Sequence, residues 1–122
     1  MATRKEVKVL IVDDEPSITK TMSEHFNLSG INTSVAKNGK EALEMAKNSE
    51  FNVIITDYNM PSMNGLELIK KLKKYKHLLS TSVILIYDCS DSSDLSEAIS
   101  MADWSMKKPF NYETLATELL KY

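Results

Sequence analysis

Three aspartates and one lysine have the side chains that phosphate or metal chemistry would use. Asp13 and Asp14 are adjacent, whereas Asp57 and Lys108 lie far along the chain from them. Each comes directly after a short, largely apolar run, or within two residues of its end. Acidic residues are common in turns, so one of them alone would more often cap a helix than form a site. A group of them with a lysine is harder to explain in that way.

Clustered carboxylates repel one another unless a cation lies among them. A small set of hard oxygen ligands suits Mg²⁺, which keeps some of its waters and binds a substrate phosphate. Such a metal would neutralise charge on an incoming phosphoryl group, and a lysine could share the remainder. An aspartate carboxylate can then act as nucleophile and become an acyl phosphate. These residue types therefore favour Mg²⁺-assisted phosphoryl transfer, provided that the fold brings them together.

The elements that must position these residues alternate between strands and helices along the chain. Short apolar runs alternate with segments of helical periodicity, which favours a parallel sheet covered by helices on both faces. The expected strands are residues 7–12, 31–36, 53–56, 82–87 and 104–106. The expected helices run from 16 to before 30, from the 38–39 turn through 46, and over 66–72, 95–101 and 112–120. Since parallel strands present their carboxyl ends at one edge, the three aspartates and Lys108 should converge there.

Composition limits the class of protein. The 122 residues fit a single domain, 1–122, and 43% hydrophobic with 26% charged residues is ordinary globular composition. A net charge of −2 argues against binding nucleic acid through phosphate contacts. The apolar runs are too short to span a membrane, and no secretory signal precedes residue 7, so we expect a cytoplasmic protein. The only cysteine, Cys89, excludes an internal disulfide and a multi-cysteine zinc site.

Three motifs in order give the sequence a family resemblance. VLIVDD at residues 9–14, DYNMP at 57–61 with Gly65, and KPF at 108–110 resemble the receiver domain of two-component response regulators. The resemblance covers essentially the whole chain and is closest to a stand-alone receiver of the chemotaxis type, or to one excised from a longer protein. It implies an α/β, doubly wound, five-stranded parallel sheet with five helices, the flavodoxin-like receiver architecture.

The resemblance also implies roles for individual residues. Asp57 would be the phosphoacceptor, and Asp13 and Asp14 the acidic pair that organises Mg²⁺, with Asp14 the more direct ligand. Asp57 and the backbone carbonyl of Asn59 would complete the protein ligands, and Lys108 would pair with the phosphoryl oxygens. The donor would be a phosphohistidine on a sensor histidine kinase or a histidine phosphotransfer protein, and a downstream protein target would read the signal.

The end of the fourth expected strand departs from the family pattern. Receivers usually carry Thr or Ser there, whose hydroxyl bonds the phosphoryl group, but Tyr87 aligns with that position. A phenol reaches further than a Thr hydroxyl and cannot occupy the same space. Asp88 follows, and its carboxylate should oppose a phosphoryl dianion by about 1–4 kcal/mol at ~4 Å. A shift of three residues would use Ser90 instead, but it would make the strand too long.

The fifth expected strand departs as well. Receivers usually carry Tyr or Phe three residues before the lysine, where this chain has Ser105. Trp104 lies one residue earlier, and since strand side chains alternate faces, it cannot replace the missing ring. Met101 stands where the family commonly has Gly at the end of the fourth helix, so it must avoid or tolerate a positive φ.

These departures lead to one preferred function and three alternatives. The preferred function is a Mg²⁺-dependent phosphoacceptor that catalyses only its own phosphorylation and dephosphorylation. It would signal through residues 95–120 by an atypical relay involving Tyr87 and Ser105. The first alternative is a degenerate receiver that acts as a phosphorylation-independent interaction module. A haloacid dehalogenase-type phosphatase would need an acid where Asn59 stands, and a flavin binder would need a phosphate-cradling loop in place of residues 13–15.

Overall fold

Five parallel strands form one sheet in the order β2-β1-β3-β4-β5. The computed structural model describes residues 6–88 and 92–122, so Cys89 and the alternative alignment through Ser90 lie outside the described residues. The strands are β1 (Lys8–Val12), β2 (Asn32–Ala36), β3 (Val53–Asp57), β4 (Ser82–Tyr87) and β5 (Trp104–Lys107).

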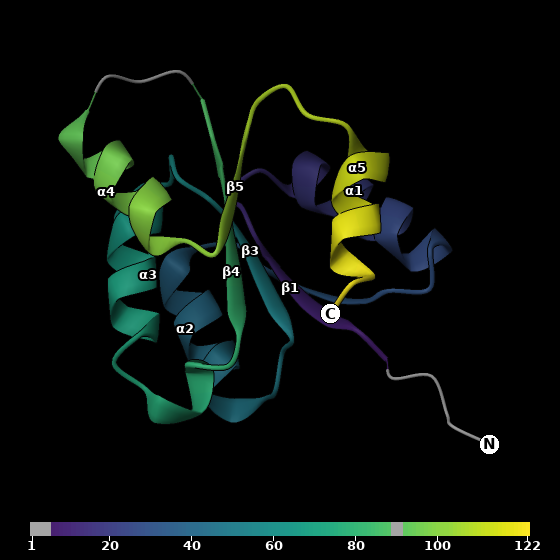
Figure 1. Ribbon diagram of the computed structural model, residues 1–122, viewed down its shortest axis with the longest axis horizontal. Helices are drawn as coiled ribbons and strands as arrows, with labels where there is room; N and C mark the ends of the chain where they lie inside the picture. The colour runs from purple at the N-terminus through teal and green to yellow at the C-terminus, as the bar shows by residue number, and fades with distance from the viewer. Residues whose placement is uncertain (1–5, 89–91) are drawn as a thin grey trace.

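Helices cover both faces of the sheet, as Figure 1 shows, with α2, α3 and α4 on one side and α1 and α5 on the other. They are α1 (Pro16–Leu28), α2 (Gly39–Asn48), α3 (Gly65–Leu72), α4 (Ser93–Met101) and α5 (Tyr112–Leu119), with a 3₁₀ turn, η1, at Lys76–Leu78. The doubly wound α/β fold expected from the sequence is therefore confirmed. None of the helices in the described ranges is both long and apolar enough to cross a membrane.

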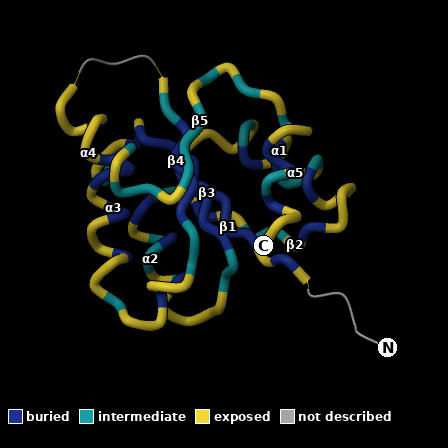
Figure 2. The backbone as a smooth tube through the Cα atoms, in the orientation of Figure 1, coloured by how far each residue is buried: buried dark blue, intermediate teal, exposed yellow. Residues whose placement is uncertain are grey.

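The strands are buried on both faces, which explains their continuous apolar runs. Alternate residues of β1 enter two different clusters: Leu10 and Val12 join the core beneath α2, α3 and α4, whereas Val9 and Ile11 join the core beneath α1 and α5. In Figure 2 the strands form the buried centre of the molecule, and the exposed residues lie on the outer sides of the helices. Each strand therefore holds a fixed position between two packed layers.

Polar side chains define where most helices begin. Asn38, Asn64 and Asn111 precede α2, α3 and α5, and each side chain accepts a hydrogen bond from an N–H in the first turn. Ser92 caps α4 in the same way, through the N–H of Leu95. These caps satisfy donors that have no partner within the helix. The helices α3 and α4 begin one and two residues before the expected starts at 66 and 95, because a cap fixes a helix start more sharply than apolar periodicity does.

Three local conformations bear on the site and on the expectations for it. The last residue of β3 is Asp57 itself, so the strand extends one residue beyond the expected range and holds this aspartate in its ladder. Met101 ends α4 in helical conformation, and Ala102 follows with φ −72° and ψ 150°. Met101 thus avoids positive φ. Ser62 is the one non-glycine residue with positive φ in the described ranges, at 68°.

Candidate functional site

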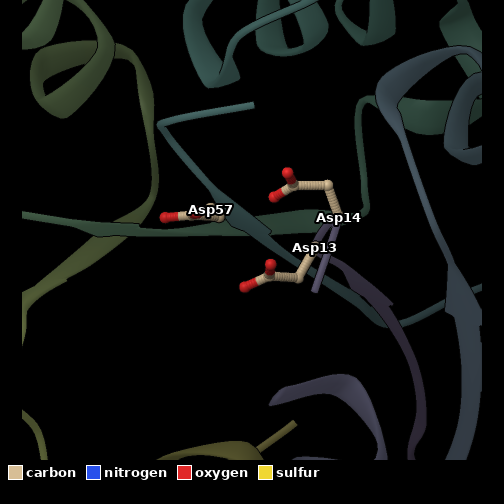
Figure 3. A group of neighbouring side chains, drawn as sticks. All are labelled: Asp13, Asp14 and Asp57. Carbon is tan, nitrogen blue, oxygen red and sulfur yellow. The ribbon is translucent and has the colours of Figure 1, made fainter. Parts of the chain in front are cut away.

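Three carboxylates meet beyond the carboxyl ends of β1 and β3. One oxygen from each of Asp13, Asp14 and Asp57 lies within 4.8 Å of the others. Figure 3 shows the three side chains directed toward the same space beyond the strand ends. Asp13 and Asp57 are buried, at 6% and 5% exposure, whereas Asp14 is exposed. The convergence expected from the sequence is therefore present.

The sheet register sets these positions. Val12 pairs with Thr56 across β1 and β3, so the residues that follow, Asp13 after β1 and Asp57 at the end of β3, lie side by side at this edge of the sheet. The Asp13 N–H donates to the carbonyl of Ala36 at the end of β2. Its carboxylate Oδ1 accepts from the N–H of Glu15 at 3.0 Å. Because these contacts come from backbone groups, the acidic residues are held before any ligand arrives.

Lys108 enters from the end of β5 and completes the charged group. Its Nζ lies 3.1 Å from Oδ1 of Asp57. The Lys108 N–H donates to the carbonyl of Tyr87 at 2.8 Å, which ties the residue to the end of β4. The peptide bond between Lys108 and Pro109 is cis. The lysine is thus placed by backbone contacts and meets the aspartate as the sequence predicted.

Burial and charge compete in the site. Burial is the main reason that the pKa of Asp13 rises to about 6; the N–H of Glu15 opposes the rise, and the charge of Asp57 adds to it. Burial also raises the pKa of Asp57, against the opposing contact with Lys108. For Lys108, burial alone would lower the pKa of the ammonium, but Asp57 and then Asp13 and Asp88 outweigh it and raise that pKa. Within the described residues, the Lys108 ammonium is the positive group in contact with these carboxylates, and it offsets the cost of burying their negative charge only in part.

The donor set fits a small hard cation. Oδ1 of Asp57 is buried and accepts no hydrogen bond from the described residues, so its only close neutralising contact there is the Lys108 ion pair. Carboxylate oxygens are the ligands that Mg²⁺ prefers, at ~2.0–2.1 Å. Oxygens within 4.8 Å of one another would need only small side-chain movements to share such an ion. A cation would relieve the same repulsion that raises the two aspartate pKa values.

Tyr87 and Asp88 occupy the edge of the site. Tyr87 is half-buried and packs against the core beneath α4, as do Ile99 and Met101 of that helix. Asp57, in contrast, lines a small hollow on the α1 and α5 side together with Phe110. Asp88 is exposed, and its charge contributes to the raised pKa of Lys108. The backbone of Tyr87 therefore lies next to the site, where its carbonyl accepts from Lys108, but its ring packs on the other face of the sheet, beneath α4.

The fifth strand separates its two unusual residues as expected. Trp104 pairs with Ile84 and packs with the core beneath α1 and α5. Ser105 pairs with Leu85, which belongs to the core on the other face. The indole thus lies on the opposite side of the sheet from the position of the missing aromatic ring, and it does not replace that ring.

One contact near the site has no signal in the sequence. Met63, in the loop after β3, lies against Gly39 at the start of α2. The two residues are distant in the chain. Their contact could be predicted only if it were already known that α2 begins beside this loop.

Comparisons with known proteins agree with this geometry. The family model described as the response regulator receiver domain matches residues 9–120. Chemotaxis protein CheY-3 of Vibrio cholerae is 32% identical over 119 residues, which are 96% of this chain and 92% of that protein. Transcriptional regulatory protein CrdR of Helicobacter pylori is 32% identical over 94% of this chain but only 54% of CrdR. This chain thus spans about half, or less, of the length of several longer relatives.

A solved structure extends the likeness to three dimensions. Chemotaxis protein CheY4 of Vibrio cholerae superposes with a TM-score of 0.85 at 33% identity, covering 96% of this chain and 98% of that one. The family match spans nearly the whole chain, and the fold and the order of the motifs agree with it. This chain therefore belongs to the response regulator receiver domains of two-component systems and resembles the stand-alone, CheY-like members.

Proposed function

We propose that this chain is a single receiver domain, residues 1–122, that takes a phosphoryl group onto Asp57 in a Mg²⁺-dependent reaction. The observation that carries the proposal is the grouping of the Asp57 carboxylate with Asp13, Asp14 and the Lys108 ammonium at one sheet edge. The reaction occurs on the protein itself, so the chain does not act as an enzyme on a separate metabolite.

The chemistry is a phosphoryl transfer between nucleophiles. A carboxylate oxygen of Asp57 attacks the phosphorus of a phosphohistidine, the P–O bond forms as the P–N bond breaks, and the imidazole leaves with the electron pair. Lys108, which already faces Asp57, pairs with the phosphoryl oxygens as negative charge accumulates on them. Hydrolysis by water later returns the carboxylate and releases phosphate.

Asp13, Asp14, Asp57 and the backbone carbonyl of Asn59 would hold the metal. When bound, Mg²⁺ supplies neutralisation of the charge that develops on the transferred group. Asp13 is held by the N–H of Glu15, whereas Asp14 is exposed to solvent. This difference supports Asp14 as the more adjustable, direct ligand and Asp13 as the group that organises the site.

The donor would be a histidine kinase or a histidine phosphotransfer protein, as for receiver domains in general, and the recipient of the signal a downstream protein. One relative, sporulation initiation phosphotransferase F of Bacillus subtilis, is 29% identical over 94% of this chain. Its name indicates phosphoryl transfer by a protein of similar length, which supports the proposal without identifying the partner of this chain.

Intact mass spectrometry after incubation with acetyl phosphate tests the phosphoacceptor directly. We expect a gain of one phosphoryl group that requires Mg²⁺ and is absent in Asp57→Asn. Binding of Mg²⁺ without any gain would point to Asp88 and Tyr87 blocking small donors, and the same assay would then be run with a phosphohistidine donor. Absence of both labelling and Mg²⁺ binding would overturn the proposal in favour of the phosphorylation-independent interaction module.

The signal would leave the site by an atypical relay through Tyr87. The Lys108 N–H donates to the Tyr87 carbonyl, and the tyrosine ring packs against the core that also contacts α4. A phosphoryl group that attracts the Lys108 ammonium would therefore move the end of β4. Ser105 is small, so the space that an aromatic side chain fills in other receivers is available for the Tyr87 ring to move. Structures with and without beryllofluoride should differ at Tyr87; an unmoved tyrosine and β4–α4 segment would contradict this relay.

A further inference from the structure

The loop between β3 and α3 carries Asn59, and hydrogen bonds fix both of its ends. The Tyr58 N–H donates to the carbonyl of Ile86 in β4 at 2.8 Å, and the Gly65 N–H donates to the carbonyl of Tyr58 at 2.9 Å. The Asn64 side chain caps α3. Between these anchors the chain must be held by other contacts if the Asn59 carbonyl is to keep a defined direction.

The middle of the loop is tightly turned. The Met63 N–H donates to the carbonyl of Pro61 at 2.7 Å, and Ser62 has a positive φ of 68°, a conformation that non-glycine residues adopt at a cost. Met60 is buried, at 8% exposure. The turn directs the Met63 side chain away from the loop and toward α2.

Met63 meets α2 at Gly39, the first residue of the helix. A Cβ placed on Gly39 would lie 2.6 Å from Sδ, 3.0 Å from Cγ and 3.1 Å from Cβ of Met63. Such distances are well below ordinary van der Waals contact of ~3.5–4.0 Å. The thioether therefore occupies the space that any larger residue would need.

The conformation of Gly39 does not itself demand glycine. Gly30 is the glycine with positive φ in the described ranges, at 82°, and Asn38 caps α2 with its side chain. A helix start tolerates most residues, and Gly lowers helix stability relative to Ala. The close approach of Met63 is thus the structural reason for the absence of a side chain at residue 39.

We infer that the packing of Met63 against Gly39 positions the β3–α3 loop for metal binding, and that both are positioning residues that set the Mg²⁺ affinity. This inference rests on the proposed function, because it assigns the loop the task of presenting the Asn59 carbonyl. The buried Met60 holds the first half of the loop, and the contact with Gly39 holds the second half at Met63, whose Cβ would lie 3.1 Å from a Cβ on residue 39. A side chain at residue 39 would therefore push on the Met63 Cβ and, through it, on the loop backbone. Residues that orient metal ligands commonly change affinity by about 10- to 100-fold when altered.

The first test is Mg²⁺ binding by titration calorimetry on the whole chain, with Gly39→Ala. We expect the dissociation constant to rise about 10-fold, the lower end of the range for residues that orient ligands. Gly30→Ala is the matched control. A Cβ at residue 30 would meet no atom within 4 Å, but the alanine backbone would have to adopt the strained φ of 82°. The control should lower the thermal midpoint and leave Mg²⁺ affinity unchanged.

A double-mutant cycle identifies the contact itself. Met63→Ala removes Sδ and Cγ, the two atoms nearest to the added methyl group. Met63→Ala alone should weaken Mg²⁺ binding, and Gly39→Ala should have a much smaller effect in that background than in the wild type. Equal effects of Gly39→Ala in both backgrounds would overturn the inference.

The outcomes separate this inference from the proposed function. Failure of the wild-type chain to bind Mg²⁺ at millimolar concentration would overturn the proposed metal site. Normal Mg²⁺ binding by the wild type, with unchanged affinity in Gly39→Ala despite a lowered thermal midpoint, would leave the site intact and make the contact purely structural.

Discussion

Asp13 combines a buried position with a charge that the neighbouring groups among residues 6–88 and 92–122 do not fully balance. Burial raises the pKa of its carboxyl group to about 6. The carboxylates of Asp14 and Asp57 face it and act in the same direction, whereas the Lys108 ammonium acts in the opposite one. Below pH 6 the metal-free site therefore holds a proton that Mg²⁺ must displace.

Mg²⁺ affinity should consequently depend on pH. Since each unit below the pKa of Asp13 makes displacement of one proton about tenfold harder, we expect the Mg²⁺ dissociation constant to be about tenfold higher at pH 5 than at pH 7. Titration calorimetry at the two pH values measures this ratio. In Asp13→Asn the ratio should shrink to the share due to Asp57, and an unchanged ratio would show that Asp13 is not the group that titrates.

At the scale of elements, the sequence predicts the strands and helices well because burial on both faces leaves continuous apolar runs. It also predicts that Asp13, Asp57 and Lys108 converge, since their places at strand ends are a matter of topology. It does not predict that Tyr87 packs under α4 while Asp57 borders the α1 and α5 layer. Nor does it predict the contact of Met63 with Gly39, because side-chain packing between distant segments leaves no periodic pattern.

The start of α3 packs so closely against the end of β3 that residue 65 has no room for a side chain. A Cβ on Gly65 would lie 2.8 Å from Cδ1 of Leu85, 2.9 Å from Cα of Tyr58 and 3.1 Å from the carbonyl oxygen of Asp57. Two of these neighbours are backbone atoms, which cannot rotate away as a flexible side chain can. The start of α3 is thus seated directly on the segment that bears Asp57.

Gly65→Ala should therefore lower the free energy of unfolding by about 1–3 kcal/mol, the usual cost of overpacking a core. Urea denaturation measures the loss. Labelling of Asp57 by acetyl phosphate should slow as well, because the Asp57 backbone must shift. Gly30→Ala, which strains the backbone far from this junction, should lose stability without slowing the labelling, and equal labelling rates for the two variants would contradict the argument.

For the whole molecule, the acidic site weakens the fold that carries it. The pKa of Asp13 is 3.8 in the absence of the fold and about 6 within it. Between these values the folded state binds more protons than the unfolded state, so the stability due to Asp13 is lost as pH rises from ~4 to ~6. At pH 7 that loss is complete; the shift corresponds to ~3 kcal/mol, which solvent at the open edge of the site reduces to about 1–2 kcal/mol.

Asp13→Asn should therefore stabilise the metal-free protein at pH 7 by about 1–2 kcal/mol. Asparagine keeps an oxygen for the N–H of Glu15 but carries no charge.

Mg²⁺ at 100 times its dissociation constant should stabilise the wild type by about 2.7 kcal/mol, and the variant by much less at the same concentration. The order of thermal midpoints should thus reverse: the variant is the more stable protein in EDTA, and the wild type gains more when Mg²⁺ is added. Glu24→Gln, an exposed acid on α1, is the control and should change neither midpoint appreciably. A variant no more stable than the wild type in EDTA would show that the buried charge of Asp13 does not oppose folding.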